Sequence, residues 1–136
     1  MKKKSSADTD LKKIIKAKEI VHDEFNKPLT LAYVARKIKM DPRKLSRQFK
    51  KVHYLSFQEY YIELRASEGI ILLLQNKLRI NEIARATGYT TTQSFSRMFK
   101  KVTGMAPTPW QKLQLNNPRG TYPWIMKEPF ISYATK

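Results

Sequence analysis

The chain repeats one stretch of itself, and this repeat decides the fold. Ser46-Arg47-Gln48-Phe49-Lys50-Lys51-Val52 returns as Ser96-Arg97-Met98-Phe99-Lys100-Lys101-Val102, so that six of seven residues match at an offset of 50. Upstream, Leu31-x-x-Val34-Ala35-Arg36 matches Ile80-x-x-Ile83-Ala84-Arg85 at an offset of 49. Because the offsets differ by one, the second copy carries an extra residue in the turn between its two parts. One structural unit therefore occurs twice.

Each copy has the pattern of two short helices joined by a turn. In the first copy, Thr30 and the pair Asp41-Pro42 are typical of helix starts. In the second copy, Gly88 suits a turn that needs a positive φ, and Thr90-x-x-Gln93 has the form of a capping box. The second helix of each copy has an apolar stripe, formed by Leu45, Phe49 and Val52 or by Phe95, Phe99 and Val102. This pattern predicts two helix-turn-helix units.

The whole sequence predicts an all-α fold of about seven helices. The helix-turn-helix units cover about residues 30–52 and 80–102, within a folded domain of about residues 11–112. The capping box Ser56-Phe57-Gln58-Glu59 starts a linking helix of about residues 57–75. Residues 1–10 form a basic N-terminus that we expect to be disordered. Residues 113–136 form an aromatic C-terminal extension.

Positive charge is the dominant global property. Lys and Arg number 27 against 11 Asp and Glu, giving +16 overall, and residues 28–112 alone carry a net +11. Such a surface attracts DNA, RNA or an anionic membrane, although a solubility surface is the plainer alternative. No apolar run reaches the roughly 20 residues of a membrane span. The deep, narrow groove of RNA suits helix reading less well than the B-form groove. We therefore expect double-stranded DNA as the partner, no membrane association, and a cytoplasmic, nucleoid-associated location.

The second helix of each unit is the expected reading helix, because that helix enters the major groove. The positions pointing away from its apolar stripe are Arg43, Ser46, Arg47 and Lys50 in the first unit, and Thr92, Gln93, Ser96, Arg97 and Lys100 in the second. Arg pairs with guanine, Gln with adenine, and Ser or Thr with several bases. Two alternatives stay open: the lysines can form a solvated face or contact phosphate, and the serines can simply allow close approach. Helix N-termini at Leu31, Pro42 and Ile80 can also bind phosphate.

The linking helix gives a length scale. Its 19 residues span roughly 28 Å at 1.5 Å per residue. One turn of B-DNA is roughly 34 Å long. A helix of this length can set two reading helices about one turn apart on the same face of the duplex.

The composition also excludes several kinds of chemistry. The chain has no Cys, two His and four Gly, so it offers no thiol nucleophile, disulfide or Cys-based zinc site. No Ser-His-Asp spacing, carboxylate pair or phosphate-binding glycine loop is present. We expect no enzyme activity, no metal site and no cofactor. Phe49, Phe99 and Trp110 are expected in the core, and His53 at the surface.

With the repeat laid out, the sequence resembles the DNA-binding domain of the AraC/XylS family of bacterial transcription regulators, over about residues 11–112. The resemblance is carried by Pro28-Leu29-Thr30-Leu31-x-x-Val34-Ala35, Leu45-Ser46-Arg47-x-Phe49-Lys50-Lys51, Tyr60-x-x-x-Leu64-Arg65, Ile80-x-x-Ile83-Ala84-x-x-x-Gly88-Tyr89 and Phe95-Ser96-Arg97-x-Phe99-Lys100-Lys101-x-x-Gly104-x-x-Pro107. It implies a monomer with two homeodomain-like helix-turn-helix units on one long helix. It also implies a sequence-specific regulator that reads an asymmetric promoter site in two successive major grooves.

The chain departs from the family pattern at five positions. Lys39 and Tyr54 stand where Gly is usual, which makes the first unit's turns less ideal. Gly69 replaces the usual Ala in the linking helix, at a cost of up to about 1 kcal/mol in helix propensity, but permits close packing. Arg79 and Ala106 replace capping Ser or Thr. Only about ten residues precede the first predicted helix, so the chain resembles the small stand-alone members, which have no ligand-sensing domain.

A second hypothesis is an interaction module. In this alternative DNA binding is weak or non-specific, and the aromatic C-terminal tail docks a partner protein such as RNA polymerase. The residues that suggest it are Trp124, Phe130 and Tyr133, which lie outside the repeat. A tail that folds back on the domain's own apolar surface is the competing explanation.

Overall fold

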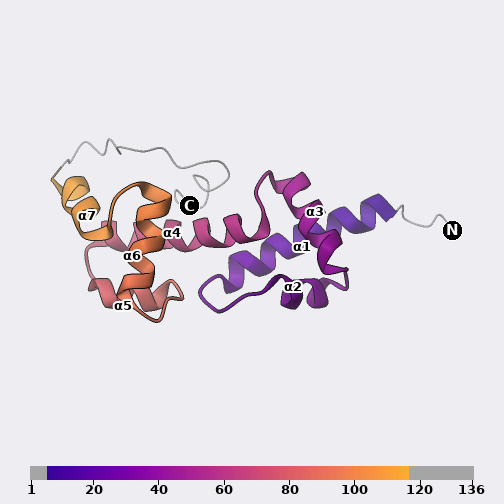
Figure 1. Cartoon of the computed structure of the whole chain (residues 1–136), viewed down its shortest axis with the longest axis horizontal. Helices are drawn as coiled ribbons and strands as arrows, with labels where there is room; N and C mark the ends of the chain where they lie inside the picture. The colour runs from indigo at the N-terminus through magenta and orange to yellow at the C-terminus, as the bar shows by residue number, and fades with distance from the viewer. Residues whose placement is uncertain (1–5, 117–136) are drawn as a thin grey trace. The chain divides into compact units, whose positions relative to one another are not determined.

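The computed structural model describes residues 6–116, and all regular structure in this part of the chain is α-helical. The helices are α1 (Ser6–Glu24), α2 (Leu31–Ile38), α3 (Pro42–His53), α4 (Phe57–Gln75), α5 (Ile80–Ala86), α6 (Thr92–Thr103) and α7 (Pro107–Leu115), as Figure 1 shows. The all-α prediction is confirmed. The chain divides into two compact units at Tyr61 and Ile62, so α4 begins in the first unit and ends in the second.

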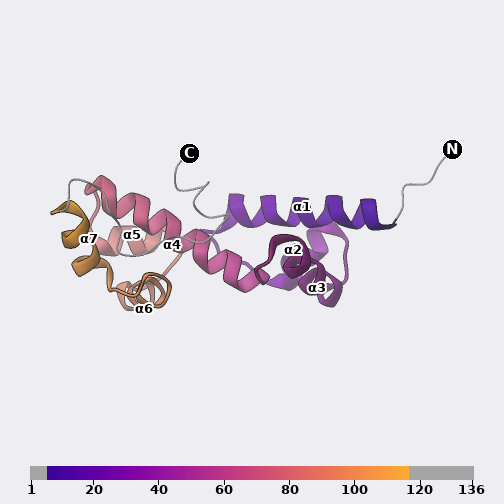
Figure 2. The same ribbon diagram turned by 90° about the horizontal axis from the view of Figure 1, so that it is seen from above.

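The first unit packs α1, α2, α3 and the start of α4 around one core. In Figures 1 and 2 α1 runs alongside both α2 and α3. The fully buried side chains include Ile14 of α1, Val34 of α2, Phe49 of α3 and Tyr60 of α4. The ring of Phe49 meets that of Tyr60 edge to face at a centroid distance of 5.7 Å. Helix α3 is thus held by its apolar stripe, which leaves its opposite face outward.

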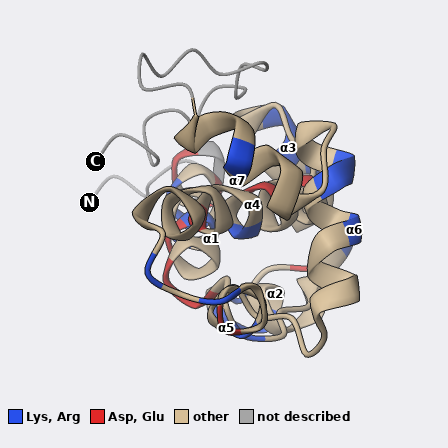
Figure 3. Cartoon of the chain, turned by 90° about the vertical axis from the view of Figure 1, so that its left-hand side faces the viewer, with Lys and Arg blue, Asp and Glu red and all other residues tan. Residues whose placement is uncertain are grey.

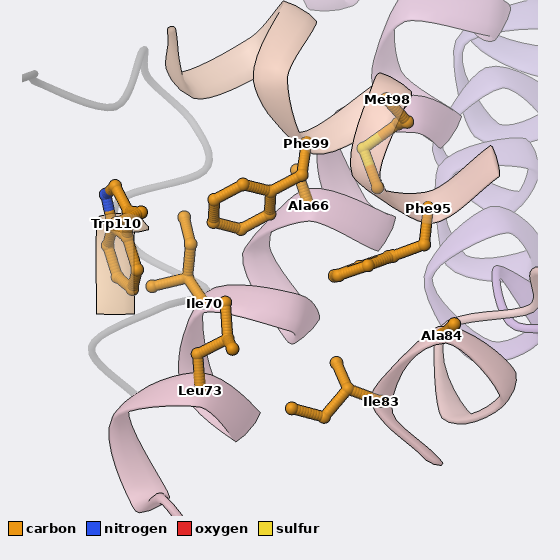
Figure 4. Packing of buried hydrophobic residues seen from close by; sticks show 9 residues of the cluster. All are labelled: Ala66, Ile70, Leu73, Ile83, Ala84, Phe95, Met98, Phe99 and Trp110. Atoms are coloured by element: carbon orange, nitrogen blue, oxygen red, sulfur yellow. The ribbon is translucent and has the colours of Figure 1, made fainter. Parts of the chain in front are cut away.

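The second unit repeats this arrangement with the rest of α4 and with α5, α6 and α7. Figure 4 shows Ile70 and Leu73 of α4 beside Ile83, Phe95, Phe99 and Trp110 in one apolar cluster. The rings of Phe99 and Trp110 meet edge to face at 5.5 Å. Phe49, Phe99 and Trp110 are each 0% exposed, which confirms their expected place in the core.

The turns of the two units have the same hydrogen bonds. Lys39 N–H donates to Arg36 O (3.2 Å) and Met40 N–H to Ala35 O (2.9 Å), while Gly88 N–H donates to Arg85 O (3.0 Å) and Tyr89 N–H to Ala84 O (2.8 Å). Lys39 has φ 57° and Gly88 has φ 97°, so both residues are left-handed. These pairs keep the offset of 49, whereas the N-caps Asp41 and Thr91 have an offset of 50. The extra residue is therefore Thr90.

Three of the predicted helix caps are confirmed and one is wrong. Thr30 Oγ1 accepts the N–H of Tyr33, Asp41 caps α3, and Ser56 and Glu59 exchange both bonds of a capping box. The box predicted from Thr90 to Gln93 does not form. Instead Thr91 Oγ1 accepts the N–H of Ser94 (3.1 Å), because Thr90 lengthens the turn and moves the cap by one residue.

The first helix begins earlier than the sequence pattern predicts. Residues 6–10, expected to be disordered, form the first turn of α1. Asp10 is tied to α3 by contacts with Lys44 and Gln48, and Asp8 lies where a helix favours negative charge. The expectations for residues 1–5 and 117–136, including the aromatic tail, lie outside the described residues.

Candidate nucleic-acid interface

All nine predicted contact residues lie on α3 or α6, on the side away from the buried stripe. The side chains of Arg43, Ser46, Arg47, Lys50, Gln93, Arg97 and Lys100 are exposed, and those of Thr92 and Ser96 are half-buried. Leu45 and Phe49 of α3, and Phe95 and Phe99 of α6, are 0% exposed on the opposite faces. Figure 3 shows Lys and Arg in blue on both helices. Each unit thus presents to solvent one polar helix face that carries basic side chains.

The two helix faces are equivalent but not identical. Ser46, Arg47 and Lys50 correspond to Ser96, Arg97 and Lys100 at the offset of 50. Arg43 of α3, however, corresponds to Gln93 of α6. The two positions therefore differ in chemistry: arginine side chains are typical partners of guanine, and glutamine side chains of adenine.

The start of α3 is not the phosphate site that the sequence suggests. Asp41 Oδ2 already accepts the backbone N–H groups of Arg43 (3.0 Å) and Lys44 (3.2 Å). A carboxylate there both occupies these donors and repels a second anion. At the start of α6 the cap is the neutral hydroxyl of Thr91. The prediction of a backbone phosphate site at Pro42 is therefore wrong.

Four exposed basic residues near α3 and α6 were not predicted from the sequence as DNA contacts. Arg36 and Lys37 of α2 and Arg79 and Arg85 near α5 are exposed. They lie on or beside α2 and α5, the helices that precede α3 and α6, and add to the positive charge of each helix-turn-helix unit. The repeat could have pointed to two of them, since Arg36 and Arg85 occupy equivalent positions at the offset of 49.

Two side chains of α4 contact the loops of the two units. The guanidinium of Arg65, only 8% exposed, lies 4.7 Å from the ring centroid of Tyr89 in the α5–α6 turn. In the first unit the Tyr61 hydroxyl donates to Lys27 O (2.7 Å) and accepts the N–H of Leu29 (3.2 Å). These contacts connect α4 to the turn of one unit and to the α1–α2 loop of the other.

His53 is not the surface residue that was expected. Its Nε2 lies 3.4 Å from Ile14 O, and its ring meets Phe49 edge to face at 4.6 Å. Burial lowers the pKa of His53 below its ordinary value, and the charge of Lys18 adds to this, while the Ile14 carbonyl opposes it. His53 therefore belongs to the packing between α1 and α3.

Residues 6–116 contain neither a candidate metal site nor a membrane-spanning helix. No three His, Asp or Glu side chains of this region come together in a way that could hold a metal ion. None of its helices combines the length and the apolar character needed to span a membrane.

Comparisons with known proteins agree with this geometry. The sequence model of the helix-turn-helix domain family matches residues 34–113. The chain is 31% identical over 100 residues to the Msm operon regulatory protein of Streptococcus mutans, covering 74% of this chain. Among solved structures, the C-terminal domain of AraT, a response regulator from Geobacillus stearothermophilus, has a TM-score of 0.72 at 29% identity. This match covers 86% of the present chain and 89% of that one.

A transcriptional regulator from Chromobacterium violaceum, described as having an AraC-type DNA-binding domain, has a TM-score of 0.70 at 25% identity. This match covers 80% of the present chain and 96% of the other. The streptococcal relative is much longer, since the match spans 36% of it. From the matched family, the repeated units and their outward basic helices, we conclude that the chain belongs to the AraC-type helix-turn-helix family of DNA-binding transcription regulator domains.

Proposed function

We propose that this domain binds an asymmetric promoter site by inserting α3 and α6 into two successive major grooves. The observation that carries the proposal is the duplicated helix face, in which Arg47 and Arg97 occupy equivalent exposed positions above the buried Phe49 and Phe99. Base edges in the major groove are read by side chains of this kind. The 19 residues of α4 supply a scaffold roughly 28 Å long, close to one DNA turn.

The difference between the two helix faces supports an asymmetric site. Arg43 and Gln93 are equivalent positions with different base preferences, so the two halves of the site differ in sequence. One chain carries both reading helices and needs no second copy to contact two grooves. We therefore propose a monomer, which a stoichiometry of one chain per site, measured by sedimentation with labelled duplex, would support.

The contact residues are tested by Arg43→Ala and Arg97→Ala. Each change should weaken binding to the preferred site by about 1–3 kcal/mol if the side chain contacts a guanine, and relax selectivity there. Lys112→Ala, an exposed position on α7, is the charge-matched control and should cost much less. If both arginine variants bind specific and non-specific duplexes as the control does, these helices are not the reading helices.

Salt dependence tests how much of the net +16 takes part in binding. If about 6–10 phosphates are contacted, affinity should fall by about 10³–10⁵ between 50 and 200 mM salt. A nearly flat dependence would mean that the basic faces of α3 and α6 do not lie against the duplex.

Regulation of transcription through contact with RNA polymerase, within a cytoplasmic, nucleoid-associated protein, is part of the same proposal. The regulatory role is supported by the names of two relatives, an operon regulatory protein and a transcriptional regulator. In vitro transcription from a promoter with the selected site, with and without the protein, tests it. The alternative of an interaction module with weak DNA binding has no support from these relatives. An enzymatic role has none either.

A further inference from the structure

Two side chains of α1 contact the first helix-turn-helix unit at the turn before α3 and at the start of α3. Asp10 Oδ2 lies 2.9 Å from Lys44 Nζ and accepts a hydrogen bond from Gln48 Nε2 at 3.4 Å. One helical turn further along α1, Lys13 Nζ donates to Lys39 O at 2.9 Å. Asp10 and Lys13, here called the α1 latch, thus hold both the turn before α3 and the first two turns of α3.

The contacts of Asp10 are partly buried and charge-assisted. The Asp10 side chain is only 16% exposed, and the Lys44 side chain is 39% exposed. The hydrogen bond from Lys44 is the largest cause that lowers the pKa of Asp10; burial opposes it, and Gln48 and the charges of Lys44 and Lys13 add to the lowering. Asp10 is therefore ionised at neutral pH. Charge-assisted hydrogen bonds of this kind are shorter and stronger than neutral ones.

Within the described part of the second unit, residues 62–116, no equivalent of this latch is found, and the turn there has less need of one. Its turn uses Gly88 at the left-handed position, where the first unit has Lys39 with φ 57°. A left-handed non-glycine residue strains the backbone, and the Lys13 contact holds the carbonyl of that residue. The counterparts of Lys44 and Gln48 are Ser94 and Met98, so the second unit has no cation at the first position and no hydrogen-bond donor side chain at the second. The latch therefore compensates for a turn that only the first unit has.

We propose that Asp10 and Lys13 are positioning residues that fix the orientation of α3 and thereby present Arg43 and Arg47 to DNA. This inference rests on the proposed reading role of α3. It gives α1, which carries none of the predicted base contacts, an indirect part in sequence selection through α3. It also explains why Lys44 faces α1 and does not belong to the outward row of α3.

The test compares two pairs of variants in the full chain. Asp10→Asn and Lys13→Met remove the latch. Glu19→Gln and Lys16→Met change the charge by the same amounts at an exposed ion pair of the same helix, whose side chains are 59% and 64% exposed. Any general electrostatic effect on DNA binding is therefore matched within each pair.

Two measurements decide the outcome. The first is amide hydrogen exchange over residues 39–48, which should become faster in the latch variants and stay unchanged in the controls. The second is affinity for three duplexes: the selected site, and the same site with either half scrambled. Each half is assigned to its unit beforehand with Arg43→Ala and Arg97→Ala. The latch variants should lose on the order of 5-fold on the intact site and nothing once the α3 half is scrambled.

A rescue separates positioning from a simple loss of charge. Adding Lys39→Gly to Lys13→Met removes the strained left-handed residue and should restore slow exchange and most of the lost affinity. The inference is overturned if the latch variants match their controls in both measurements, or if they weaken both halves of the site equally. A wild-type chain that prefers no duplex would contradict the proposed function itself, and the exchange comparison would still decide whether the latch fixes α3.

Discussion

Phe49 and Tyr60 meet edge to face, with ring centroids 5.7 Å apart and ring planes at 76°. Fifty residues later, Phe99 and Trp110 meet in the same way, at 5.5 Å and 77°. The contact is conserved between the two units although its second partner changes from Tyr to Trp. In each unit an equivalent phenylalanine thus anchors α3 or α6 to the helix that follows it, and this anchor sets which face of α3 or α6 points outward.

Phe49→Ala and Phe99→Ala should each destabilise their own unit by about 3–5 kcal/mol, because a fully buried ring is replaced by a cavity. Residue-specific hydrogen exchange can assign the loss to one unit. Leu113→Ala, at a position 44% exposed, is the control and should change stability by less than about 0.5 kcal/mol. An equal effect of Phe99→Ala and Leu113→Ala would show that the aromatic anchor is not what holds α6.

Tyr54 and Gly104 occupy equivalent positions, as the C-cap residues of α3 and α6. Both are left-handed, with φ 64° and 89°, and both donate to the carbonyl four residues earlier. Tyr54 is 86% exposed, so Tyr54→Gly loses little burial and should stabilise the chain by about 1 kcal/mol. Gly104→Ala should destabilise it by about the same amount, since nothing lies within 4 Å of an added Cβ and only backbone strain changes. Thermal denaturation that moves both variants in the same direction would contradict this account.

Gly69→Ala in α4 sets helix propensity against packing. Alanine gains about 1 kcal/mol of propensity over glycine. An added Cβ, however, would lie 2.9 Å from two ring carbons of Phe95, a fully buried residue that cannot withdraw. Overpacking of this kind costs about 1–3 kcal/mol, so we expect net destabilisation in denaturant titration. Gln75→Ala, at the exposed end of the same helix, should be nearly neutral, and a stabilised Gly69→Ala would mean that α6 can shift without cost.

His53 makes the stability of the first unit depend on pH. Since burial lowers its folded pKa, the unfolded chain binds the proton more readily, with an ordinary pKa of about 6.5. This contribution to stability is fully present above that pH and is lost as the pH falls below it. His53→Gln should therefore flatten the change in unfolding free energy between about pH 7.5 and 5, measured by denaturant titration at a series of pH values. Identical slopes for wild type and His53→Gln would contradict the burial of this ring.

The repeat made most of the fold predictable. Matching apolar stripes located both reading helices, and the one-residue difference in offset correctly placed an insertion in the second turn. The sequence could not tell which threonine caps α6, because Thr90 and Thr91 are equally good caps and only the bonds at Gly88 and Tyr89 show which one is extra. Likewise, the charged segment at the start of α1 has the composition of a disordered tail. The structure shows that it is helical and that Asp10 pairs with Lys44 of α3, a contact that the composition does not reveal.

The outward positions of the reading helices were also predictable, since helical period alone separates them from Phe49 and Phe99. What the pattern missed were side chains whose role depends on a distant partner. His53 is half-buried because Ile14 and Phe49 surround it, and Lys44 turns inward because of Asp10. The contacts of His53 with Ile14 and of Lys44 with Asp10 join residues more than thirty positions apart, and such contacts leave no periodic signal in a single sequence.

Selection of bound duplexes from a random library tests the central claim most directly. The account predicts a split, asymmetric motif with two parts about ten base pairs apart. Arg43→Ala should lose preference in one part and Arg97→Ala in the other, because each side chain belongs to a different reading helix. A palindromic motif, a single part lost equally in both variants, or no enriched motif at all would contradict two reading helices working on one duplex.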